Sequence, residues 1–281
     1  MKKIVAILSL LMVTSLTAQN FQGKATYKTS RKMDINFGGD RGSSMSEEQK
    51  AQMNARLMKQ FQKTFVLTFD KNSSVYKENK SLNEPVVRPA GGPNVMVQVV
   101  GGGGGNDVYY KNTKENRFVN KTEIMGKLFL IKDELPKYKW ELTNETKNIG
   151  VYTCYKATYT RQEDRTSMTI EDGETKEKTE KVDVVTTAWY TPDIPVSNGP
   201  RGFNGLPGLI LEVKEGRETI ICSEIVLNPK EKIEIQEPKK GKKVTQVEYE
   251  KIMDKKTKEM MEKFKSRRRD GRNVEIRIGG N

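Results

Sequence analysis

Residues 189–213 have the sequence WYTPDIPVSNGPRGFNGLPGLILEV, which places four prolines among closely spaced glycines between two stretches typical of strands. Proline fixes φ and glycine allows positive φ, so this density predicts a rigid corner rather than a flexible loop. In Leu206-Pro207-Gly208-Leu209 we expect a type II turn with the positive φ at Gly208. The residues from Leu209 to Val213 then continue as a largely buried strand.

The rest of the corner also holds turn-forming residues and no nucleophile, general base or metal-ligand cluster. Pro192 and Pro195 stop the strand that contains Trp189 and Tyr190, because proline cannot donate to a sheet ladder. A second turn is expected at Asn198-Gly199-Pro200. Tight turns demand these residues whatever the function, so a purely structural corner is an equally good interpretation.

This segment resembles the GLPGLI family, which is named after the run from Gly205 to Ile210. The resemblance extends over about residues 149–213 and is carried by Tyr152 to Ala157, Trp189, Tyr190, Pro192, Pro195, Asn198, Gly199, Pro200, Phe203, Gly205, Leu206, Pro207, Gly208, Leu209 and Ile210. Members are exported proteins of Bacteroidetes-type bacteria without an agreed biochemical activity, so the resemblance implies export and no known reaction. Arg201 and Gly202 depart from the family pattern, in which an aromatic or aliphatic residue is commoner.

Residues 1–18 are expected to be a signal peptide. Lys2 and Lys3 precede an apolar run from Ile4 to Leu16, and Ala18 offers a small residue for cleavage. The run is too short to span a bilayer, and no cysteine follows it that would carry a lipid anchor. We therefore expect a protein of the periplasm or outer envelope that is peripheral to a membrane at most.

The remaining chain predicts a mainly β fold, either a single curved antiparallel sheet or a partly open barrel, over residues 19–240. Strand-like runs recur about every ten residues, and no alternating helices support a parallel sheet. The expected strands are 21–28, 65–69, 75–77, 108–111, 117–120, 128–132, 140–143, 151–160, 167–171, 182–190, 209–214, 219–227 and 232–236. The charged stretch 171–181 is interpreted as a solvated hairpin loop, and the Gly/Pro-rich stretch 78–107 as a flexible insertion.

Two capping boxes predict two helices. Ser46 with Gln49 opens an amphipathic helix over about residues 47–62. Thr245 with Glu248 opens a basic helix to about Arg268, within a C-terminal segment of residues 241–281. The run 274–278 that follows is either an edge strand or a frayed tail.

The chain contains no histidine, which excludes Ser-His-Asp and Cys-His catalysis and imidazole metal sites. No cofactor is expected. Cys154 and Cys222 are its two cysteines, and in an oxidising compartment they form either one disulfide or two separate buried thiols.

Three function classes remain. The leading hypothesis is a non-enzymatic envelope protein that binds a hydrophobic small molecule or an envelope protein beside the corner, with Trp189, Phe203 and Leu206 facing the ligand. The second is docking on anionic surfaces through the basic helix, because residues 239–272 carry 14 Lys and Arg against six Asp and Glu, although a solvated charged helix is the plainer account. The candidate anion-binding residues are Lys263, Lys265, Arg267, Arg268 and Arg269. The third is a carboxylate-based hydrolase that uses Asp193 or Glu212. Nucleic acid is not expected as a partner, because export separates the protein from it.

Overall fold

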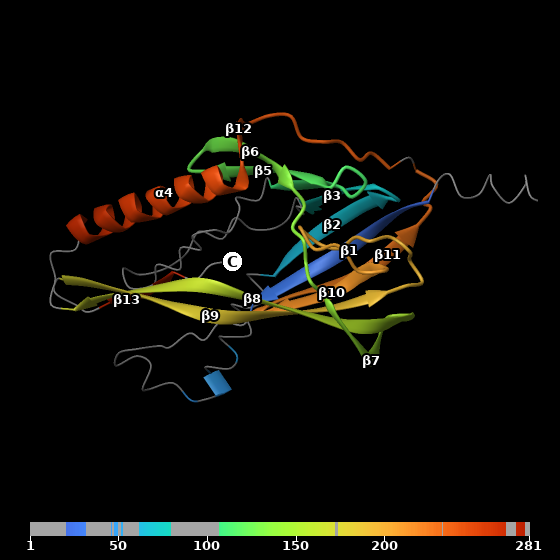
Figure 1. Cartoon of the computed structure of the whole chain (residues 1–281), viewed down its shortest axis with the longest axis horizontal. Coiled ribbons are helices and arrows are strands. Elements are labelled where there is room, and N and C mark those ends of the chain that lie inside the picture. Colours follow the sequence, from blue (N-terminus) through green and yellow to red (C-terminus); the bar gives the residue numbers. More distant parts are fainter. Residues whose placement is uncertain are drawn as a thin grey trace, which may run out of the picture.

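The computed structural model describes residues 21–31, 46, 48–49, 52, 62–79, 107–171, 174–231, 233–267 and 274–278. Within them, 13 strands form one large sheet, with the helix α4 (Gln246–Arg267) near the C-terminus (Figure 1). The strands are β1 (Gln22–Arg31), β2 (Lys63–Asp70), β3 (Ser73–Glu78), β4 (Val108–Asn112), β5 (Arg117–Ile124), β6 (Lys127–Glu134), β7 (Glu141–Ile149), β8 (Tyr152–Glu171), β9 (Glu174–Thr191), β10 (Leu209–Glu215), β11 (Glu218–Leu227), β12 (Lys242–Val244) and β13 (Val274–Ile278).

The strand order is β12-β6-β5-β4-β3-β2-β1-β11-β10-β9-β8-β13, and β7 also pairs with β8. Neighbouring strands are antiparallel except for β12 and β6, which are parallel. The prediction of a single, mainly antiparallel sheet is therefore confirmed. The sheet stays open, because β12 and β13 lie at its two ends, and it does not close into a barrel.

The two predicted helices have different outcomes. The Thr245–Glu248 capping box forms as expected, since Glu248 N–H donates to Thr245 Oγ1 (3.2 Å) and Thr245 N–H donates to Glu248 Oε2 (2.8 Å). The expected helix 47–62 lies mostly outside the described residues, although Ser46 and Gln49 do make the reciprocal bonds of a capping box. Among the described elements α4 is the one helix, and of the other expected helix only residues 48, 49 and 52 are described, which are helical.

Two further predictions are wrong in the stretches where charge dominates. Residues 174–181 are not a solvated loop but part of β9, which pairs with β8 up to Glu171 and Glu174. Ladder pairing needs no burial, and opposite charges stand across the ribbon where Asp164 pairs with Lys181. Residues 233–236 form no strand; they cross the sheet and place Ile235 on a cluster of Val75, Tyr110, Val119 and Leu130. The alternating isoleucines there reflect this contact rather than a sheet. Most of the insertion 78–107 lies outside the described residues.

The main core fills one face of the sheet, which we call the inner face. Its buried sheet residues include Tyr27, Leu67, Phe69, Ala157 and Ala188. The corner residues 192–208 lie against this face between β9 and β10 (Figure 1). A second cluster, around Phe129 and Ile131, is covered by the first turns of α4.

Candidate functional site

The corner is part of the core. Leu206, Leu209 and Ile210 are at most 1% exposed, and Phe203 is 9% exposed. Leu206 and Phe203 therefore fill the inner face and do not line a ligand site, so the predicted ligand contact through these two residues is wrong. Trp189 is partly exposed, but the Lys147 ammonium lies over its ring in a cation–π contact, 4.4 Å from the ring centroid.

The expected type II turn at Gly208 does not form. Positive φ occurs at Gly205 (φ 90°), whereas Gly208 is not among the glycines with positive φ. Gly208 N–H donates to Leu206 O (2.9 Å), which is a three-residue turn around Pro207. Gly208 is required for a different reason: a Cβ there would lie 2.1 Å from Thr191 O. The predicted second turn at Asn198-Gly199-Pro200 is displaced along the chain: the turn begins at Pro200, where Phe203 N–H donates to Pro200 O (3.1 Å).

A buried lysine fixes the corner to the sheet. Lys111 on β4 is fully buried, and its Nζ donates to Gly199 O (2.6 Å) and Phe203 O (3.0 Å). Burial holds the pKa of Lys111 well below its ordinary value. Tyr27 Oη adds a buried hydrogen bond to Ile210 O (2.8 Å). These groups are engaged by backbone carbonyls and serve the shape of the corner.

The cysteines are two free, buried thiols. Cys154 lies on β8 and Cys222 on β11, with β9 and β10 between them in the sheet. Their strands are not neighbours in the sheet, and no S–S bond joins the two side chains. Of the two alternatives left by the sequence, the structure shows separate thiols. Burial raises the pKa of Cys154 to about 11 and that of Cys222 to about 12, which disfavours the thiolate form.

The two candidate catalytic carboxylates have different surroundings. Asp193 is exposed, and its backbone N–H donates a long hydrogen bond to Thr191 Oγ1 (3.4 Å). Glu212 Oε2 forms an ion pair with Lys147 Nζ (2.7 Å).

An aromatic cluster that the sequence analysis missed lies where the corner meets the sheet. It consists of Tyr138, Trp140 and Tyr159, which are partly exposed, and it rests on Phe203. The Tyr138 ring lies 5.2 Å from Trp140 and 5.3 Å from Tyr159, measured between centroids. Trp140 Nε1 donates to Asn204 O (2.8 Å), which joins the cluster to the corner. The signal was Tyr-Lys-Trp directly before a strand, since alternate residues of an extended chain face the same side.

Two arginine–glutamate pairs lie at the β10–β11 hairpin, and one of them, Arg161–Glu215, lies near Tyr138. Glu215 and Glu218 stand opposite each other across the β10–β11 hairpin, where like charges would repel. Arg161 donates two hydrogen bonds to Glu215 (2.6 and 3.1 Å), and Arg201 donates two to Glu218 (2.7 Å each). The pKa of Glu215 is lowered because its hydrogen bonds from Arg161 and Thr186 outweigh the opposing effect of burial.

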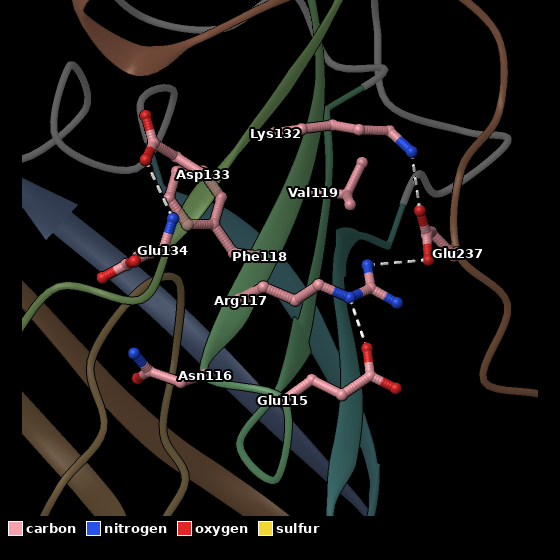
Figure 2. A pocket seen from close by; sticks show the side chains of 9 residues that line it. All are labelled: Glu115, Asn116, Arg117, Phe118, Val119, Lys132, Asp133, Glu134 and Glu237. Carbon is pink, nitrogen blue, oxygen red and sulfur yellow. Dashed lines mark hydrogen bonds and ion pairs between the residues drawn. The ribbon is translucent and has the colours of Figure 1, made fainter.

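A charged pocket of about 570 Å³ opens at the β4–β5 turn (Figure 2). Its charges pair with one another: Glu237 accepts from Arg117 Nη1 (2.9 Å) and from Lys132 Nζ (3.0 Å), and Arg117 also contacts Glu115. The pKa of Glu237 is lowered because these two cations outweigh its partial desolvation. The arrangement ties the segment 228–241 to β5 and β6, and we interpret the pocket as a structural clamp.

The basic helix is less basic in its described part than the whole segment suggested. Over 246–267 it carries seven Lys and Arg against five Asp and Glu, and Lys256 pairs with Glu259 within the helix (2.6 Å). The side chains of Lys263, Lys265 and Arg267, and all of Arg268 and Arg269, lie outside the described residues. In the part of the chain described, no helix combines the length and hydropathy that a membrane span requires. Nor do His, Cys, Asp and Glu side chains gather there in threes around a point that would suit a metal ion.

Residues 140–212 match the model of a family described as "Protein of unknown function (Porph_ging)". The matched segment begins at Trp140 and contains both Tyr152 to Ala157 and the run Gly205 to Ile210. No curated protein matches the chain.

Among solved structures, two of PNGF-II, in space groups C2 and P21, are similar to this chain, each with a TM-score of 0.49 and 15% sequence identity. Each similarity covers 84% of this chain. The chain spans about a third of the length of those chains, 33% and 34% respectively. At this level of similarity nothing about function follows.

Proposed function

We propose that this protein is a non-enzymatic, exported protein of the cell envelope that binds an envelope partner beside the corner. The observation that carries the proposal is the aromatic cluster of Tyr138, Trp140 and Tyr159, whose rings stay partly exposed at the edge of a filled core. Tyrosine and tryptophan are enriched among the residues that dominate binding energy at interfaces. Binding through a hydrophobic pocket under the corner is not proposed, because core side chains occupy that space.

The charged groups near the corner support binding rather than catalysis. The Lys111 ammonium is held by two carbonyls, Glu215 and Glu218 are each paired with an arginine, and Glu212 is paired with Lys147. Each of these groups already has hydrogen-bond or ion-pair partners within the protein. They suit a rigid surface better than proton transfer.

Export rests on the sequence pattern of residues 1–18, which lie outside the described residues. Docking on anionic surfaces through residues 263–269 stays a prediction of the same kind.

Site-specific photo-crosslinking in the native host tests the proposal. A photoreactive benzoylphenylalanine replaces Tyr159 in the full chain, and in a matched control it replaces Val226 on β11, which is 40% exposed and outside the cluster. We expect an envelope adduct from position 159 that position 226 does not give. Equal adducts from both positions, or none from position 159, would contradict the proposal, and cytoplasmic retention of the protein would refute export.

A further inference from the structure

The charged groups around the aromatic cluster limit the kinds of ligand that it can bind, provided that the cluster is the binding surface proposed above. Two guanidinium groups, Arg161 and Arg201, face three carboxylates, those of Glu163, Glu215 and Glu218. Arg161 Nε also donates to Glu163 (2.8 Å), so both arginines are committed to carboxylates. Neither guanidinium is therefore left to bind an anionic group of a ligand.

The ring geometry argues equally against a cationic ligand held in an aromatic cage. Such a cage encloses the cation between ring faces, with each centroid within about 6 Å of the charge. Here the three rings contact one another directly, with centroids 5.2, 5.3 and 6.0 Å apart. No ammonium group fits between them, and only the outward ring faces are open to a ligand.

Tyrosine hydroxyls supply the polar part of the surface. A Cβ at Gly202 would lie 3.0 Å from the Tyr109 hydroxyl oxygen and 3.7 Å from that of Tyr138, so both hydroxyls converge on this point of the corner. Burial raises the pKa of both tyrosines, which keeps the hydroxyls protonated. A protonated hydroxyl donates one hydrogen bond and accepts others, and it therefore matches a ligand group that does both.

We propose that the aromatic cluster binds a neutral saccharide, with a sugar ring lying on the outward face of Trp140 or Tyr159 and its hydroxyls bonded beside Tyr138. A sugar combines an apolar C–H face with hydroxyls that both donate and accept, and it carries no charge. Lipid chains do not fit, because the paired charges of Arg161 and Glu215 border the rings and would lose hydration. Gly202 contributes by having no side chain, which leaves the tyrosine hydroxyls uncovered by the corner.

Tryptophan fluorescence tests this proposal in the full mature chain. The protein has two tryptophans, so Trp189→Phe makes Trp140 the sole reporter. This variant is titrated with maltotriose, with chitotriose and with a sulfated heparin disaccharide. We expect a saturable change of Trp140 emission with at least one neutral trisaccharide and none with the sulfated sugar.

Substitutions at Tyr159 identify the surface. Tyr159→Ala should weaken binding about tenfold, as expected for the loss of a central ring contact. Tyr159→Phe keeps the ring and should bind within about threefold of the parent. Tyr155→Ala is the matched control, since Tyr155 lies on the same strand, is 38% exposed and contacts Tyr190 instead of the cluster. Unfolding midpoints of all variants show whether each one folds.

The proposal is overturned if neither neutral trisaccharide gives a saturable response, if the sulfated sugar binds more tightly, or if Tyr155→Ala weakens binding as much as Tyr159→Ala. Loss of saccharide binding with a retained crosslink from position 159 would refute the saccharide and leave the binding surface intact. Failure of both would refute the proposed function itself.

Discussion

Replacing Gly208 by alanine separates two explanations of the corner. The sequence favoured a glycine that supplies positive φ, whereas the structure shows a glycine that lets two backbone segments touch. The added Cβ would lie 2.1 Å from Thr191 O, 2.6 Å from Thr191 C and 3.0 Å from Pro192 Cα. All three atoms belong to the backbone, so no side-chain rotation relieves the clash.

The size of the effect follows from this geometry. Forcing apart packed backbone in a filled core should cost about 3 kcal/mol, at the upper end of ordinary overpacking. For a chain of this size we expect the thermal midpoint to fall by about 6–12 °C. Gly216→Ala is the matched control, since Gly216 has φ 53° and a Cβ there would meet nothing within 4 Å. That variant should cost only about 1 kcal/mol, the strain of a left-handed alanine.

Urea unfolding followed by tryptophan fluorescence measures both variants, and Gly208→Asn adds a decisive comparison. Asparagine tolerates positive φ, so a type II turn would make Gly208→Asn milder than Gly208→Ala. If instead the close contact with Thr191 requires glycine, Gly208→Asn should destabilise the protein at least as much as Gly208→Ala. If Gly208→Ala costs no more than Gly216→Ala, or if asparagine rescues the position, the contact with Thr191 is not what requires glycine.

Three other predictions concern charge and protonation. Lys111→Met should destabilise the protein by about 2–4 kcal/mol in urea unfolding at pH 7, because Gly199 O and Phe203 O lose their buried donor; unchanged stability would contradict its role as the anchor of the corner. Burial raises the pKa of Cys154 to about 11 and that of Cys222 to about 12 in the folded protein, whereas both thiols of the unfolded chain lose their protons at about pH 8.5. The stability that this difference contributes is present below about pH 8.5 and is lost as the pH rises toward 11. The free energy of unfolding should therefore fall less steeply above pH 9 in a Cys154→Ala/Cys222→Ala variant than in the parent, and equal slopes would refute this. Glu237→Gln should cost below about 1 kcal/mol and less at high salt, as measured by unfolding in 0.05 and 1 M NaCl, because its ion pairs are partly exposed; a large loss independent of salt would show that the clamp acts differently.

The strands were predictable where one face is buried. In β1 buried and more exposed residues alternate, so a period of two locates the element, whereas β10 is located by its continuous buried run from Leu209 to Leu211. The strand over residues 174–181 was missed because these residues include no apolar side chain, so their ladder with β8 leaves no hydrophobic pattern in the sequence. For residues 233–236 a strand was predicted and none forms, because Ile235 packs on the sheet without pairing with one of its strands.

The candidate site was predicted less well for a geometric reason. Phe203 and Leu206 were expected to face a ligand because they are apolar and lie in a loop, but the loop is itself part of the core. Tyr138 and Tyr159 are 21 residues apart in the chain and meet only because the segment before β7 crosses toward β8. A contact of this kind depends on strand order, which a single sequence does not specify.

The hydrogen bond from Trp140 to Asn204 connects these two outcomes. The proline- and glycine-rich run forms a corner that packs against the inner face of the sheet, and most of its apolar side chains are buried in this packing. What it offers outward is a rigid loop of backbone carbonyls, one of which orients Trp140 and thereby the rings stacked beside it. The run Gly205 to Ile210 would then be needed for binding without touching the ligand. Substitutions within it should lower stability and affinity together, whereas Tyr159→Ala should lower affinity alone.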